Sequence, residues 1–239
     1  MGEETNFELE DFARLSRATS FQYFKSMEKA LGADTRRYMN ECLKLKGERS
    51  ESPLTQEEYA ELGFWYRGLA RELLTYIEGL LFVMRQLIAY SEERREISLS
   101  TGESALVREV DYLFNLGRKR VEEKPRHNRF LENFILAFRF FPQVLGSRFE
   151  VDYGAHGWEK MQRLVKMRND LTHPKSVHDT LLSPEMPNII RDAAVWFFGC
   201  MRDLIATADT QLLEQSFKET AKMPEMQKLL ADRAARKEK

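Results

Sequence analysis

Three residues late in the chain, Arg168, Asn169 and His173, are of kinds that can carry out acid–base chemistry. An unperturbed histidine titrates near neutral pH, so its imidazole can take or give a proton. An arginine stays charged and can stabilise negative charge on phosphate oxygens. Together these side chains could catalyse a reaction in which charge builds up on phosphorus oxygens.

The segment that must position these residues runs from about Trp158 to Leu171. Its apolar residues recur at three- and four-residue spacing, which predicts an amphipathic helix; they are Met161, Leu164, Val165 and Leu171. Arg168 falls on the same stripe, and a buried guanidinium needs a partner. Pro174 disfavours helical backbone at the residue before it. We therefore expect His173 at or just past the helix C-terminus, where free carbonyls favour the protonated ring.

The spacing also limits how these side chains can cooperate. Asn169 lies four residues before His173 and shares its helix face. Arg168 and His173 are five residues apart, roughly 140° round and ~7.5 Å along an ideal helix. They can converge only if the helix end unwinds or if a second chain contributes.

A second helix, from Glu57 to about Glu93, is apolar on nearly every side between Leu73 and Ile88 and is expected at the centre of the fold. Glu78 is an acid within that stretch. We expect it to pair with Arg168, because each charge needs an opposite one. Two alternatives stay open at this point: Glu78 reaches solvent, or it pairs with Arg85.

The string Arg168-Asn169-x-x-x-His173 resembles the motif of the HEPN superfamily of helical domains. Its context also fits, since it lies late on an amphipathic helix, with Pro174 beyond it and a long apolar helix with one acid upstream. The resemblance covers about residues 57–215. It implies a metal-independent endoribonuclease of toxin or defence type that leaves a cyclic phosphate, with the Arg and His catalytic and the Asn orienting them.

The resemblance also implies partners. HEPN proteins typically build their site where two copies meet, so we expect a homodimer with RNA as substrate, and an antitoxin or regulatory protein as a further partner. One departure concerns the antitoxin. Many HEPN toxins that pair with a nucleotidyltransferase carry a Tyr two residues after the His, where this chain has Lys175. That particular pairing is therefore in doubt.

RNA scission suits an Arg and a His because RNA carries its own nucleophile, the 2′-hydroxyl. The sequence has no HExxH or CxxC metal motif, no glycine-rich phosphate loop and no GxSxG elbow. We expect no metal and no cofactor. The competing hypothesis is a non-catalytic binding module in which the charges only fix helix register. A third is a plain core in which Arg168 reaches solvent and His173 caps a helix.

The segment 117–129, GRKRVEEKPRHNR, is strongly basic in a chain of net charge -1. It could hold phosphates, or its charges could simply be solvated. The RNA-binding candidates are Arg118, Lys119, Arg120, Lys124, Arg126, Arg129 and Lys175. Asp170 and His178 are supporting candidates near the motif, and the alternative for His178 is an exposed loop histidine.

Composition predicts an all-α protein, since 239 residues with 43% hydrophobic content include only 12 Gly and 7 Pro and few alternating segments. We expect a HEPN-like up-and-down bundle over residues 53–217, an N-terminal helical extension over 1–52 that breaks near Gly32, and a charged C-terminal helix or tail over 218–239. Further helices are predicted over 104–121, 130–145 and 188–217, with loops at 96–103 and 146–157.

The aromatic side chains of residues 130–145 could stack on bases, but at helical spacing they are expected in the core. Cys42 and Cys200 have no CxxC spacing and are expected to be reduced thiols. No signal segment is visible, and the apolar runs around 134–145 and 193–201 are short or interrupted. These features predict a soluble, cytoplasmic protein that does not enter membranes.

Overall fold

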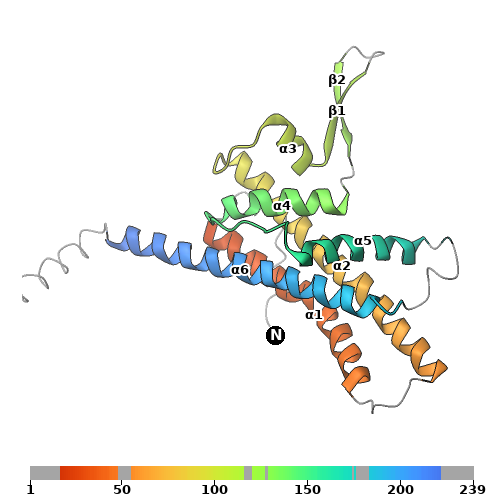
Figure 1. Ribbon diagram of the computed structural model, residues 1–239. Coiled ribbons are helices and arrows are strands. Elements are labelled where there is room, and N and C mark those ends of the chain that lie inside the picture. The colour runs from red at the N-terminus through yellow and green to blue at the C-terminus, as the bar shows by residue number, and fades with distance from the viewer. Residues whose placement is uncertain are drawn as a thin grey trace, which may run out of the picture.

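In a computed structural model of the chain, the described residues are 17–47, 55–115, 120–126, 129–173, 175 and 183–221. They form a mostly helical fold with one two-stranded sheet (Figure 1), which fits the expected all-α class apart from that sheet. The elements are α1 (Arg17–Gly47), α2 (Gln56–Glu93), α3 (Thr101–Val107), β1 (Val110–Asn115), β2 (Arg120–Pro125), α4 (Phe130–Val144), α5 (His156–Thr172) and α6 (Met186–Ala221).

Helix α2 is central, because α1, α4, α5 and α6 all contact it. It begins with a capping box: the Thr55 hydroxyl accepts the Glu58 N–H at 3.3 Å, and the Glu58 carboxylate accepts the Thr55 N–H at 2.8 Å. Among the described helices, α2 alone is long and apolar enough to span a membrane, and 61% of its most apolar stretch is buried inside the protein. Such burial is typical of a core helix.

Helix α1 runs without interruption through Gly32, so the expected break there is wrong. A single glycine costs a helix only about 1 kcal/mol, which packing can outweigh. Gly32 lies close to α2: a Cβ at this position would come within 3.4 Å of the Tyr76 ring. Phe21 and Phe24 are fully buried, and the Phe24 ring lies 4.8 Å from that of Phe141 in α4. The described part of the expected extension therefore shares the core of the bundle.

The expected helix over 104–121 is confirmed only as far as Val107, and it begins earlier, at Thr101, inside the expected loop over 96–103. Helix α3 ends at Val107, and β1 and β2 form an antiparallel hairpin whose register runs from Val110 opposite Pro125 to Asn115 opposite Arg120. The apolar spacing does fit a helix, but Glu109 adopts the left-handed conformation, with φ of 53°, and ends the helical path. The β-branched and aromatic residues that follow favour a strand once a partner strand is available. Part of the basic segment 117–129 is that partner.

An aromatic cluster joins α4, α5 and α6. The Phe134 ring is fully buried and lies 4.6 Å from Phe138, 5.3 Å from Trp158 and 5.6 Å from Trp196, measured between ring centroids. This confirms that the aromatic residues of α4 belong to the core. Gly157 lets α5 approach α6 closely, because a Cβ there would lie 2.2 Å from Trp196. The predicted helices over 130–145, 158–171 and 188–217 are confirmed, with ends shifted by a few residues.

Candidate functional site

The motif lies at the C-terminal end of α5, as Pro174 predicts. His173 follows the last helical residue and leaves the helical conformation, with φ of −128° and ψ of 64°. Its N–H donates to the Asn169 carbonyl at 2.9 Å, which holds the residue against the helix end. The side chains of Asn169, Asp170 and His173 are exposed. The imidazole is thus available to a ligand from solvent.

Arg168 pairs with Glu78, which is the expected partner. The Arg168 Nη2 donates to Glu78 Oε1 at 3.0 Å, with 25% of the arginine side chain and 44% of the glutamate side chain exposed. Arg85, the alternative partner for Glu78, is instead 2.9 Å from Glu109 through Nη1 and Oε1. Among the described residues, the Nε of Arg168 has no hydrogen-bond partner. The ion pair therefore fixes the guanidinium through Nη2 and leaves the buried Nε uncommitted.

A further residue that sequence reasoning missed, Arg71, holds the end of α5 against α2. Its Nη2 donates to the Leu171 carbonyl at 3.0 Å, one of the carbonyls that the helix end leaves without an intrahelical partner. Thr172 donates its hydroxyl to the Arg168 carbonyl at 2.7 Å. A signal was present in the sequence: Arg71, Glu78 and Arg85 recur every seven residues, so they share one face of a helix that is otherwise largely apolar.

A small cavity adjoins the ion pair. It measures about 260 Å³ and lies between α2 and α4, and its lining residues are Glu78, Leu81, Phe82, Arg85, Phe130 and Asn133. Because Glu78 both lines this cavity and binds Arg168, the cavity and the motif share a wall. Sequence reasoning did not identify the cavity, since it depends on the crossing of α2 and α4.

The basic candidates separate into three groups. Arg118, Lys119 and His178 lie outside the described residues. Arg120 and Lys124 belong to β2, and Lys124 is exposed on a hairpin that stands away from the helices (Figure 1).

The third group lies closer to the bundle. At the base of the hairpin, Arg126 Nη1 is 3.5 Å from Asp111 Oδ1. Arg129 is exposed and immediately precedes Phe130, which lines the cavity. Lys175 is exposed just beyond the motif. Among the basic candidates that the structure describes, Arg129 therefore lies next to a residue that lines the cavity.

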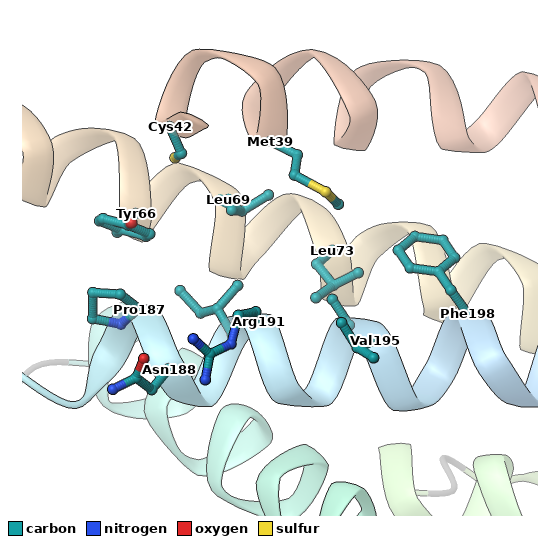
Figure 2. A pocket seen from close by; sticks show the side chains of 12 residues that line it. Met39, Cys42, Tyr66, Leu69, Leu73, Pro187, Asn188, Arg191, Val195 and Phe198 are labelled. Carbon is teal, nitrogen blue, oxygen red and sulfur yellow. The ribbon is translucent and has the colours of Figure 1, made fainter. Parts of the chain in front are cut away.

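The opposite face of α2 has a different cavity, of about 200 Å³, between α1, α2 and α6 (Figure 2). Tyr66, Leu69 and Leu73 line it, and they lie roughly 120–180° round α2 from Glu78. Burial, and secondarily Glu41, raises the pKa of Cys42 in this cavity to about 11. That thiol stays protonated at neutral pH and is a poor nucleophile. This cavity does not suit acid–base chemistry.

No protein-family model matches this chain, and comparisons with curated proteins and with solved structures give no match either. Within the described ranges, no group of three or more His, Cys, Asp and Glu side chains could hold a metal ion. A functional conclusion therefore depends on the geometry of the motif and its neighbours.

Proposed function

We propose that this chain is a metal-independent endoribonuclease of toxin or defence type, built on a HEPN-like bundle, and that Arg168 and His173 cut RNA. The observation that carries the proposal is the ion pair between Arg168 and Glu78. It ties the permanent positive charge of Arg168 to the core helix α2. Along α5, Arg168 lies roughly one and a half helical turns before the exposed His173. Arg168 is thus held on a rigid element, as catalysis requires, and His173 directly follows the end of that helix. We further propose that the protein works in the cytoplasm.

The reaction uses the substrate's own nucleophile. The 2′-hydroxyl oxygen attacks the adjacent phosphorus; the new P–O2′ bond forms, the P–O5′ bond breaks, and the products carry a 2′,3′-cyclic phosphate and a 5′-hydroxyl. His173 removes the 2′-hydroxyl proton or protonates the leaving 5′-oxygen. Arg168 stabilises the charge on the non-bridging oxygens with donors that Glu78 does not occupy. Asn169 and Asp170, on the same exposed turn, orient the two groups.

One histidine cannot remove a proton and donate another at the same moment. We therefore propose a homodimer in which the 168–175 segments of two copies line one cleft, so that one His173 acts as base and its partner as acid. Lys175 and the base of the basic hairpin would contact flanking phosphates by charge attraction. An antitoxin or regulatory protein would block the same cleft.

The test compares two histidines on the same helix. His173→Ala should lower cleavage of a labelled transfer RNA, measured in excess EDTA, at least ~100-fold. His156→Ala is the matched control, because His156 is exposed at the opposite end of α5. We expect full activity from this variant and nearly unchanged thermal melts from both. Full activity in the His173 variant would overturn the proposal.

A titration tests the shared cleft. Subunits of wild type and His173→Ala are mixed at known ratios and allowed to exchange. If cleavage needs both histidines, activity should follow the square of the wild-type fraction, because mixed dimers are inactive. A linear dependence would mean that each subunit acts alone.

The alternative function is a non-catalytic module that dimerises or binds a partner. One observation favours it: Glu78 already neutralises the charge of Arg168, as a purely structural pair would. This function predicts that purified wild type forms a stable dimer and cuts no RNA, including structured RNA. That result would replace the nuclease proposal.

A further inference from the structure

The cavity between α2 and α4 holds buried polar groups whose bonding is incomplete. Arg85 is only 6% exposed, and its Nε has no hydrogen-bond partner among the described residues. The same is true of the Asn133 side-chain oxygen. Both side chains line the cavity, and each keeps one buried polar atom, a donor on Arg85 and an acceptor on Asn133, whose hydrogen-bonding capacity is unused. Buried polar atoms are rarely left without a partner, and each exception needs an explanation.

These two side chains are anchored on one oxygen atom. Glu109 Oε1 lies 2.9 Å from Arg85 Nη1 and accepts a hydrogen bond from Asn133 Nδ2 at 3.4 Å. The spare donor and the spare acceptor therefore lie within a few bond lengths of the same atom. Glu109 reaches this place with a left-handed backbone, φ 53°, which is strained for a residue with a side chain. Such strain persists where the surroundings impose it and is concentrated at binding sites.

The cavity also presents an aromatic surface. Phe82 is 53% exposed although it follows Glu78 by one helical turn on the central helix, and Phe130 lies across the cavity at the start of α4. A large apolar side chain gains little from exposure to water. A flat ligand that covers its ring would remove that surface from solvent and add a stacking contact.

The charges around the cavity are balanced. Arg85 is paired with Glu109, and Glu78 is paired with Arg168. A phosphate placed inside would meet the Glu78 carboxylate, and among the residues that line the cavity no uncompensated cation would offset that repulsion. A neutral planar ring with one donor and one acceptor on its edge would satisfy both unused atoms once the Arg85 and Asn133 side chains turn toward it. The volume of about 260 Å³ is slightly below that of pockets for drug-sized ligands, so it suits a single ring system.

We propose that this cavity is a nucleobase subsite, in which Phe82 stacks on an RNA base next to the scissile phosphate and Arg85 and Asn133 read its edge. The proposal deepens the ribonuclease function and rests on it. Glu78 links the two parts, because it borders the cavity and holds Arg168. The nuclease would then prefer particular bases beside the cut, since a stacked base is distinguished by its hydrogen-bonding edge.

The first experiment measures binding without turnover. His173→Ala protein is titrated with each of the four ribonucleoside monophosphates, and binding is followed by calorimetry. We expect at least one to bind, and Phe82→Ala in the same background to weaken it about tenfold, the loss typical of a stacking side chain. Phe64→Ala is the matched control, because Phe64 is similarly exposed on α2 but does not line the cavity. Absence of binding, or an equal effect of both variants, would overturn the subsite.

The second experiment separates the subsite from the nuclease. Cleavage positions in a random-sequence RNA library are compared for wild type, Phe82→Ala and Asn133→Leu. We expect the wild-type base preference to flatten in both variants, while Phe64→Ala keeps it. If wild type cuts RNA but the variants keep the full preference, the subsite is wrong and the nuclease stands. If wild type cuts nothing but nucleotides bind through Phe82, the nuclease is wrong and the subsite stands.

Discussion

The two faces of α2 use opposite physical means to hold their neighbours. On one face, Tyr66, Leu69 and Leu73 are buried and border an apolar cavity shared with α1 and α6 (Figure 2). On the other face, charged side chains seven residues apart each contact a different partner: Arg71 a carbonyl of α5, Glu78 the arginine of the motif, and Arg85 the residue before β1.

We infer that the apolar face sets the stability of the fold and that the charged face sets the position of the motif. Apolar burial is non-directional and scales with area, so it holds α1 and α6 without fixing individual atoms. Ion pairs at partly exposed sites add little free energy, but they fix geometry. Substitutions on the apolar face should therefore unfold the protein, and those on the charged face should misplace the motif while leaving the fold intact.

The largest effect is expected on the apolar face. Leu73→Ala removes a fully buried side chain and should lower the free energy of unfolding by about 2–5 kcal/mol, measured by urea denaturation. Val195→Ala is the control, because Val195 borders the same cavity but is 68% exposed. This variant should change the free energy of unfolding by under ~0.5 kcal/mol. Equal losses would mean that the cavity wall, rather than burial, sets stability.

The apolar face should also weaken at alkaline pH. In the folded state the pKa of the Cys42 thiol is about 11, whereas its ordinary value is 9.0. Between pH 9 and pH 11 the unfolded chain has therefore released a proton that the folded chain retains. Stability is thus full below pH 9 and falls as pH rises toward 11, by roughly 2 kcal/mol. Denaturant titrations should show a shallower fall for Cys42→Ala. An unchanged slope would assign the loss to other groups.

On the charged face, Glu78→Gln should affect activity more than stability. The ion pair is partly exposed, so its loss should cost at most about 1 kcal/mol of unfolding free energy. The rate of RNA cleavage should fall about tenfold because Arg168 loses its anchor. Glu61→Gln, an exposed position on the same helix, should leave both unchanged. A large stability loss with normal cleavage would reverse the roles given to the two faces.

The smallest effect is expected at Arg71. Arg71→Met removes the donor to the Leu171 carbonyl and should cost about 1 kcal/mol, the usual net value of one hydrogen bond. The loss should be local, with faster amide hydrogen exchange confined to the last turn of α5. Faster exchange throughout α2 would show that Arg71 supports the core as well.

Several features of the site follow from the sequence. The Thr55 and Glu58 capping box marks the start of α2, Pro174 marks the end of α5, and the opposed charges at Glu78 and Arg168 indicate their pairing. Each depends on short-range pattern or on the cost of an unpaired charge in an apolar setting. The role of Arg71 and the cavity lined by Asn133 could not be predicted, because they depend on how distant helices cross.

Local sequence pattern predicted helices α2, α4, α5 and α6 and placed an Arg and a His around one helix terminus. These are local properties, set by side-chain spacing and by proline. Long-range contacts set two other features: the segment after Val107 forms a hairpin, and Gly32 lies inside an unbroken helix. In both places local preference was weak, and contacts with segments far along the chain determined the conformation: Arg85 and Asn133 around Glu109, and Tyr76 beside Gly32.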